Sequence, residues 1–183
     1  CDWSSDVCSS DLDIASGLGT PPWLSANLRH CTRCGGRLVF GEIPGEGRER
    51  LACEDCGHIS YVNPRLVATA IPVTDEGKVI LIRRGIEPGL GSWAQPGGFL
   101  EADETAIQGA VRETREETGL EVMTTGIVGL YSRTQGAIVV VAFTARIVGG
   151  AMTTTPEALH VRTFPLAAIP WDEIAFDTSI WAI

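Results

Sequence analysis

Apolar residues in the second half of the chain are grouped in short runs of the kind that form buried strands. The runs at residues 66–73, 79–82 and 137–143 are rich in β-branched side chains. Residues 75–77, Asp-Glu-Gly, separate the first two runs and predict a tight turn between neighbouring strands. None of the runs is long enough to cross a membrane.

A single amphipathic helix is predicted at residues 105–118, and Gly119 suits the left-handed residue just past its C-terminus. At about 100° per residue, the charged side chains fall on one arc of roughly 140°. These side chains are Arg112, Glu113, Glu116 and Glu117. The neighbouring arc is predicted to face a core and holds Ile107, Ala110, Val111, Thr114 and Thr118.

Three carboxylates on one helix face repel one another by a few tenths of a kcal/mol per pair. One interpretation is a solvated acidic face. The other is a site for a divalent cation, because carboxylate oxygens are the ligands that Mg²⁺ and Mn²⁺ prefer. The glycine loop at residues 96–98 and the placement of Arg112 within the acidic face favour the cation site.

The spacing of these residues resembles the Nudix box. Gly98 is followed after five residues by Glu104, and after seven more by the run of residues 112–120, Arg-Glu-Thr-Arg-Glu-Glu-Thr-Gly-Leu. Thr114 stands where the pattern has an aliphatic residue, and its volume close to that of Val predicts a small packing cost. The resemblance covers residues 66–183 and implies an α/β fold, an α-β-α sandwich with a mixed sheet.

The resemblance also implies roles for individual residues. Glu116 and Glu117 would be the main ligands of Mg²⁺ or Mn²⁺, with Glu113 as a third. Arg112 would orient these carboxylates through charge-assisted hydrogen bonds, and Glu104 would tie the loop to the start of the helix. Gly97 and Gly98 would permit a sharp turn and a close approach of the backbone to the metal. The general base would be Glu157 or a glutamate of the helix.

Four cysteines predict a second metal site in the first half of the chain. Cys31 and Cys34 form one C-x2-C pair, Cys53 and Cys56 form another, and 18 residues separate the pairs. This spacing is typical of a structural zinc ribbon, here at residues 29–60 with a hairpin between the pairs. A disulfide pair and rubredoxin-like iron are the alternatives. Four thiolates would leave zinc no open position, so this zinc would not be catalytic.

A zinc ribbon followed by a Nudix domain resembles NADH pyrophosphatases, but the SQPWPFP-type motif that those proteins carry after the box is absent here. The downstream sequence is more similar to zinc-ribbon ADP-ribose and FAD pyrophosphatases. The expected function is hydrolysis of the pyrophosphate bond of ADP-ribose or FAD. The alternatives are NADH or NAD hydrolysis, and an inactive ligand-sensing regulator. Arg83 and Arg84 follow a strand and could contact phosphate or pair with an acid.

The 183 residues suit one medium domain and a small module, and 44% of them are hydrophobic. The net charge of −9 disfavours nucleic acid or an anionic membrane as a partner. The resemblance implies a small-molecule nucleotide as the substrate. The expected compartment is the cytoplasm. The sequence leaves the oligomeric state open, with a homodimer as one state expected for the family.

The first twelve residues, CDWSSDVCSSDL, resemble the conceptual translation of a sequencing-library adapter. The alternative is a disordered polar tail. No basic and apolar segment of a signal peptide is present in this stretch. Residues 13–28 are expected to form a linker or disordered segment rich in Gly, Pro and Ser.

Overall fold

The computed structural model describes residues 28–133 and 136–183. The adapter-like segment expected at 1–12 and the linker expected at 13–28 lie outside the described residues, except for Leu28. The chain divides between Asn63 and Pro64 into two compact units, each with its own core. Among the helices of the described part, none combines the length and the apolar character needed to span a membrane.

The smaller unit is a three-stranded antiparallel sheet. Its strands are β1 (Leu38–Glu42), β2 (Glu49–Cys53) and β3 (Ile59–Ser60). The hairpin predicted between the two cysteine pairs is therefore confirmed. Its small core consists of Leu38 and Leu51 packed beside two cysteine side chains, so the sulfur ligands are part of the core itself.

The larger unit contains a seven-stranded sheet whose main order is β10-β5-β4-β9-β8, with β6 beside β5 and β7 beside β4. The strands are β4 (Arg65–Val73), β5 (Val79–Arg84), β6 (Trp93–Ala94), β7 (Gly97–Phe99), β8 (Leu120–Arg133), β9 (Ile138–Gly150) and β10 (Ala158–Phe164). Strands β4 and β9 run parallel, whereas the other pairs are antiparallel. The mixed sheet predicted from the resemblance is confirmed.

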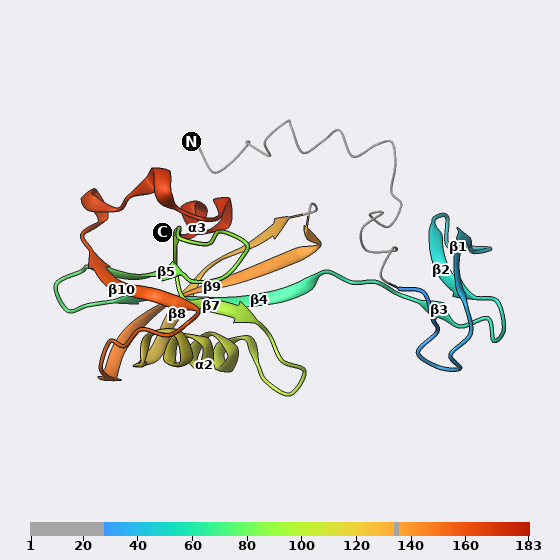
Figure 1. Cartoon of the computed structure of the whole chain (residues 1–183), viewed down its shortest axis with the longest axis horizontal. Coiled ribbons are helices and arrows are strands. Elements are labelled where there is room, and N and C mark those ends of the chain that lie inside the picture. The colour runs from blue at the N-terminus through green and yellow to red at the C-terminus, as the bar shows by residue number, and fades with distance from the viewer. Residues whose placement is uncertain (1–27, 134–135) are drawn as a thin grey trace. The chain divides into compact units, whose positions relative to one another are not determined.

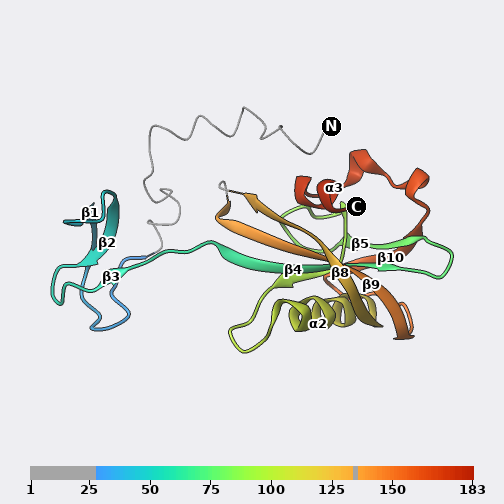
Figure 2. The ribbon, with the colours of Figure 1, turned by 180° about the vertical axis from the view of Figure 1, so that it is seen from behind.

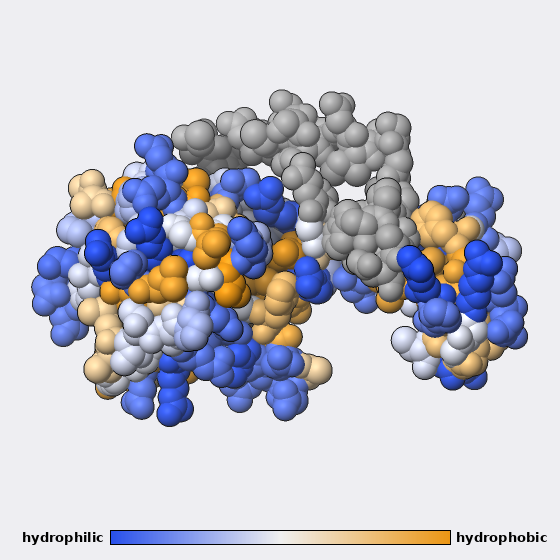
Figure 3. All heavy atoms as spheres, viewed as in Figure 1, coloured by the Kyte–Doolittle hydropathy of each residue, from blue (hydrophilic) through white to orange (hydrophobic). Residues whose placement is uncertain are grey.

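Helical elements cover both faces of this sheet (Figures 1 and 2). Helix α2 (Ala106–Thr118) lies on one face, and the short helix α3 (Asp177–Ala182) lies on the other. Two 3-10 turns at Leu166–Ala168 and Trp171–Glu173 precede α3. The surface of the larger unit over α2, at its lower edge in Figure 3, is mainly hydrophilic, as expected for a helix with one charged face.

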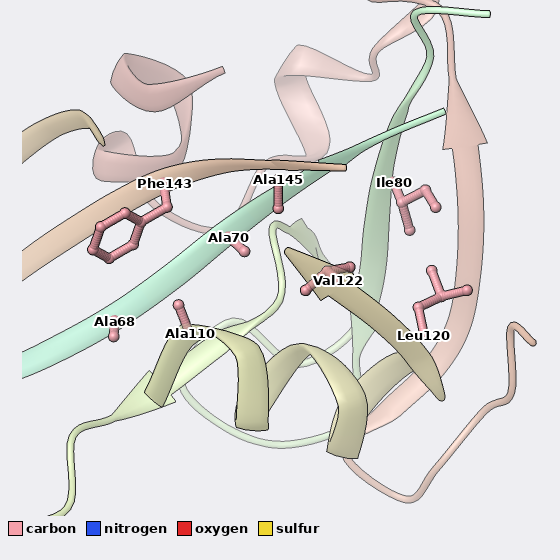
Figure 4. Packing of buried hydrophobic residues seen from close by; sticks show 8 residues of the cluster. All are labelled: Ala68, Ala70, Ile80, Ala110, Leu120, Val122, Phe143 and Ala145. Carbon is pink, nitrogen blue, oxygen red and sulfur yellow. The ribbon is translucent and has the colours of Figure 1, made fainter. Parts of the chain in front are cut away.

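Alternation along β4 divides the core between the two faces. Ala68 and Ala70 pack under α2 against Ala110 (Figure 4), whereas Ile71 packs on the opposite face with Trp93. The three alanines let α2 approach the sheet closely, because none of them extends beyond Cβ. The close approach brings the backbone of β7 within reach of side chains on α2.

Helix α2 is capped at both ends. Thr105 and Gln108 form a capping box, and Gly119 at φ 72° donates its N–H to the carbonyl of Arg115. An N-cap of this kind contributes about 1 kcal/mol. Thr114, the one departure from the box pattern, is fully buried and donates its hydroxyl to the carbonyl of Ala110 at 2.7 Å. The hydroxyl is thus satisfied within the helix, which explains why an aliphatic residue is dispensable there.

The predicted core face of this helix was wrong at one position. Ile107 is 50% exposed, whereas Glu117 is only 6% exposed. The first turn of α2 turns Ile107 away from the sheet, and the close contact near Gly97 covers Glu117 instead. The strand expected at 137–143 is also longer than predicted, because β9 continues to Gly150 in pairing with β8.

Candidate active site and metal centre

Glu117 is held at the centre of the box by the backbone of β7. Its Oε2 accepts a hydrogen bond of 2.8 Å from the N–H of Gly97. Gly97 itself pairs with Thr69 so closely that a Cβ atom would lie 2.5 Å from the carbonyl oxygen of Ala68. Burial raises the pKa of Glu117 to about 8, and the Gly97 hydrogen bond opposes this only in part. A buried carboxylate of this kind is one that a bound cation would stabilise.

Arg112 connects three carboxylates. Its guanidinium donates to both oxygens of Glu104, at 3.0 and 2.6 Å, and to Glu113 and Glu116 at 2.8 and 3.0 Å. It also donates to the carbonyl of Phe99 at 3.2 Å. The arginine thereby fixes the loop before α2 and the acidic face of α2 to one another, as a planar fork of donors permits.

Glu104 and Gly98 complete the entry to the helix. Glu104 accepts the N–H of Glu101 at 3.0 Å, and the hydrogen bonds from Arg112 lower its pKa to about 2. A Cβ atom at Gly98 would lie 2.5 Å from Oε1 of Glu113, so glycine makes room for that carboxylate. Burial raises the pKa of Glu113, which lies beside this glycine.

Glu157 lies directly before β10, and its carbonyl accepts the N–H of Gly85 at 2.8 Å. Its side chain is exposed. After burial, which is the largest cause, the negative charge of Glu157 contributes to the raised pKa of both Glu113 and Glu117. The structure thus brings Glu157 into electrostatic contact with the helix glutamates, although the two segments are far apart in sequence.

The two neighbouring arginines, which the sequence could not tell apart, face different surroundings. Arg83 donates to the carbonyl of Gly91 and stacks with the ring of Trp93. Arg84 donates to the carbonyl of Pro88, stacks with Phe176, and lowers the pKa of Glu117 by its charge. Strand alternation is the sequence signal that separates such a pair. Arg84 is therefore the arginine that acts on the acidic site.

The glutamates of α2 do not form a closed ligand cluster. Within residues 28–133 and 136–183, the four cysteines are the one group of three or more ligand side chains whose ligand atoms all lie within 4.8 Å of one another. Glu113 and Glu116 are held by Arg112, and Glu117 by Gly97. The acidic site is thus an open set of hard oxygen donors.

The cysteine cluster is assembled and closed. Cys34 Sγ lies 3.4 Å from Cys53 Sγ and 3.3 Å from Cys56 Sγ, and Cys31 Sγ lies 3.8 Å from Cys56 Sγ. A tetrahedral zinc with bonds of 2.3 Å would set such separations at about 3.8 Å. All four cysteines are free thiols, so the disulfide alternative does not describe this structure.

Backbone N–H groups in the turn of the first cysteine pair support zinc binding. The N–H groups of Arg33 and Gly36 point to the sulfurs of Cys31 and Cys34. The Gly36 N–H lowers the pKa of Cys34, but hydrogen bonds with Cys56 and Cys53 outweigh it and raise that pKa to about 12. Four adjacent thiols therefore do not ionise together unless a cation neutralises them, and thiolates are the ligands zinc takes in such ribbons.

Gln95 was not among the residues predicted to act in the site. It is buried directly before the loop that binds Glu117, and its side-chain oxygen has no hydrogen-bond partner among the described residues. The sequence signal was a glutamine set between Ala94 and Pro96, in a stretch otherwise apolar up to the glycine pair.

Comparison with known proteins identifies a family for each of the two units. The NUDIX domain family matches residues 64–181, and the Nudix N-terminal zinc-ribbon family matches residues 29–62. The chain is 32% identical over 121 residues to an ADP-ribose pyrophosphatase of Methanocaldococcus jannaschii, which covers 64% of this chain and 70% of that protein. It is also 30% identical over 161 residues to the NAD-capped RNA hydrolase NudC of Pseudomonas aeruginosa, which covers 87% of this chain. The chain spans about half of that NudC, 54% of its length.

Among solved structures, a NUDIX hydrolase from Nitrosomonas europaea superposes with a TM-score of 0.79 at 35% identity, covering 83% of this chain and 86% of that one. The NUDIX domain of Shewanella oneidensis NrtR, in complex with ADP ribose, superposes with a TM-score of 0.54 at 30% identity, covering 64% and 82% of the two chains. The Nudix domain implies dependence on a divalent metal, and the four-cysteine ribbon implies zinc. The intact box on α2, the mixed sheet beneath it and the matched family together establish that the chain belongs to the Nudix hydrolase family.

Proposed function

We propose that the larger unit hydrolyses the pyrophosphate bond of ADP-ribose or FAD with Mg²⁺ or Mn²⁺. The observation that carries the proposal is the buried Glu117 beside an arginine-bound set of carboxylates, in a chain similar to an ADP-ribose pyrophosphatase. Buried negative charge of this density calls for a cation, and the donors are the hard oxygens that these two ions prefer.

In this proposal Glu116 and Glu117 are the main metal ligands and Glu113 is the third. Arg112 is a positioning residue, because its fork holds Glu113 and Glu116 in fixed orientations. Glu104 anchors Arg112, and the glycine pair lets the backbone approach the metal. Zinc is bound by Cys31, Cys34, Cys53 and Cys56 and has a structural role.

When bound, the divalent ion polarises phosphoryl oxygens and lowers the pKa of the attacking water. The remaining work of this chain is to position and to move protons. Glu157 or a helix glutamate accepts the proton of the water. Arg84 lies on the same acidic site and is suited to meet the charge of the substrate phosphates, since its guanidinium is already fixed by Pro88 and Phe176.

Two alternative functions have specific support. The NudC similarity extends over both the ribbon and the Nudix domain, and it favours NAD or NADH as a substrate. The similarity to the NrtR domain, which was solved in complex with ADP ribose, is compatible with the alternative of an inactive protein that senses this ligand. The box carboxylates, three of them held by Arg112 and Glu117 held by Gly97, favour an enzyme over such a regulator.

We also propose that the substrate is a free nucleotide in the cytoplasm, because a net charge of −9 disfavours a polyanionic partner such as an RNA chain. A homodimer is proposed as the oligomeric state on the basis of family resemblance. Sedimentation of the purified chain would test the dimer, and a matched pair of NAD and NAD-capped RNA would test the choice of free nucleotide.

The test of the activity is a substrate panel with Mg²⁺ and with Mn²⁺. The panel contains ADP-ribose, FAD, NADH, CoA, dNTPs and diadenosine polyphosphates. We expect ADP-ribose or FAD to have the highest kcat/KM, and AMP to be one of the products. Preferred cleavage of NADH would instead select the NudC-like alternative.

The variant Glu116→Gln is expected to lose most of this activity, because it removes a ligand oxygen charge and keeps the shape of the side chain. Glu121→Gln is the matched control, since Glu121 is an exposed glutamate just beyond α2. Wild-type turnover in Glu116→Gln would overturn its role as a ligand. Binding of ADP-ribose without any cleavage by the wild type would favour the regulator.

A further inference from the structure

The side chain of Gln95 is buried with one end of its carboxamide unused. The residue is 5% exposed. Its Nε2 donates to the hydroxyl of Thr69 at 3.5 Å, the outer limit of a hydrogen bond, and its Oε1 has no partner among the described residues. Leaving a buried acceptor unsatisfied is costly, so native structures seldom keep one without a use for it.

Gln95 stands next to the loop that holds the acidic site. The carbonyl of Pro96 pairs with the N–H of Ala70, and the N–H of Gly97 binds Glu117. Through these two bonds the backbone on the C-terminal side of Gln95 is fixed to both β4 and α2. The backbone that carries the carboxamide is therefore fixed two residues from the glycine that binds Glu117.

The Gln95 side chain points to the face of the sheet that α3 covers, since its partner Thr69 is on the opposite side of β4 from Ala68 and Ala70. Thr69 pairs with Ala142 on β9, which in turn pairs with Gly129 on β8. This row across three strands carries only small side chains. A Cβ atom at Gly129 would lie 2.7 Å from the hydroxyl of Tyr131, so the glycine also allows Tyr131 to lie over the row.

We propose that Oε1 of Gln95 accepts a hydrogen bond from the exocyclic amino group of the adenine of the substrate, and that Gln95 thereby selects the base. This inference rests on the proposed function, in which ADP-ribose and FAD share an adenosine half. A carboxamide can pair with adenine by accepting from N6 and donating to N7, the pairing that Gln and Asn use on adenine in nucleic acids. The weak bond to Thr69 leaves the donor end of Gln95 free to exchange partners.

Part of the cover over Gln95 must move for a base to reach it. Helix α3 lies on that face, and it has six residues, three of them buried, and no side-chain cap. Its described polar contacts with the sheet are the hydrogen bond from Tyr131 to the carbonyl of Trp181 and the ion pair of Arg133 with Asp177. Both of these contacts are exposed to solvent.

Equilibrium binding of the mononucleotides AMP, IMP and 2′-deoxy-AMP to the full chain, measured by calorimetry, tests the inference without requiring turnover. IMP lacks the amino group, and 2′-deoxy-AMP lacks one ribose hydroxyl. We expect wild type to bind AMP about tenfold more tightly than IMP, the value of one hydrogen bond to a buried acceptor. In Gln95→Leu this preference should disappear. The substitution should change the affinities for AMP and for 2′-deoxy-AMP by the same factor.

Thr69→Val is the second variant, because it keeps the shape of Thr69, retains the Gln95 acceptor and should preserve the preference for AMP. An equal preference for AMP over IMP in wild type and Gln95→Leu would overturn the inference, as would a wild type that does not distinguish the two. Discrimination of 2′-deoxy-AMP alone would move recognition to the sugar and also overturn it. If ADP-ribose and FAD were not hydrolysed but the preference for AMP persisted, the proposed function would be wrong. The role of Gln95 in binding adenine would still be supported.

Discussion

In the ribbon, four sulfur ligands lie within 4.8 Å of one another, whereas the glutamates of the larger unit are drawn to separate partners. Two of the sulfurs, of Cys31 and Cys34, accept N–H groups of their own turn, and Cys31 and Cys53 are part of a hydrophobic core. The glutamates are held by Arg112 and by one N–H of β7. The cysteine thiolates have no hydrogen bond from a charged side chain among the described contacts, so the metal is the cation that neutralises them. Ligands that already hold an arginine can keep their geometry while metal and substrate come and go.

This difference predicts that loss of a ligand has different consequences in the two units. In Cys53→Ser the ribbon should lose its zinc and its fold, since binding of structural zinc supplies about 10–16 kcal/mol to such modules. Hydrolysis by the larger unit should change by less than about twofold, because a four-cysteine zinc has no open position for chemistry. Metal analysis and amide exchange of residues 28–63 would measure the first effect.

Serine is the matched replacement for cysteine at position 53. The control is Thr32→Ser, since Thr32 is exposed and is not a ligand. If Cys53→Ser abolished hydrolysis while the larger unit stayed folded, the proposed independence of hydrolysis from the zinc would be wrong. The ribbon would then take part in the reaction.

In Glu117→Gln the order of effects should be reversed. The substitution should lower kcat/KM by a factor on the order of 10²–10³, the loss typical of removing one group that stabilises transition-state charge. The fold should persist, and the metal-free protein should melt no lower than wild type, since a buried carboxylate becomes neutral and Gly97 keeps its acceptor. Kinetics with Mg²⁺ and a melting curve in chelator would check both statements. A lower melting temperature with unchanged kcat/KM would assign Glu117 to structure instead.

Much of this contrast could be predicted from the sequence, because both sites are local in the chain. The cysteine pairs flank one hairpin and the box spans one loop and the helix after it, and the capping of α2 by Thr105 and Gly119 follows from local rules. The burial of Glu117 could not be predicted. It depends on the approach of β7, which is set by pairing with β4.

The same limit applies to residues that act through long-range packing. Glu157 reaches the site because β10 pairs with β5, and no local pattern gives that register. The exposure of Ile107 and the unused oxygen of Gln95 likewise depend on which side of the sheet each neighbour occupies. A helical wheel shows which face of a helix is the more apolar, but how deeply each face is buried depends on its packing against the sheet.

Arg112→Lys tests whether the arginine keeps the glutamates of the site in fixed orientations. Lysine keeps the charge but cannot serve Glu104, Glu113 and Glu116 together, because its ammonium is a single point. We expect kcat/KM to fall by about tenfold to a hundredfold, as for residues that orient metal ligands. The midpoint for Mg²⁺ should rise with it. Arg115→Lys is the control, since Arg115 is exposed on the same helix. Equal losses in the two variants would show that the effect is general to the helix.

Acidification should destabilise the two units at different pH values and for different reasons. This is the smallest of the expected effects. The pKa of Glu104 is lowered from 4.5 to about 2 by Arg112 and the N–H of Glu101, so the pair stabilises the fold fully above pH 4.5. That contribution is lost as the pH falls from 4.5 towards 2. The ribbon should release zinc at higher pH, because protons compete for its thiolates.

Tryptophan fluorescence and a zinc indicator can follow the two processes in one titration of chains that carry Trp3→Phe and Trp23→Phe, since residues 28–63 contain no tryptophan and the other three lie in the larger unit. Glu104→Gln should flatten the loss of the larger unit below pH 4.5 and leave the zinc release unchanged. Glu101→Gln should leave both unchanged, because only the backbone of Glu101 contacts Glu104. If zinc release and the fluorescence change coincided in all three proteins, acid would act on one cooperative unit, and the independence of the two metal sites would be lost.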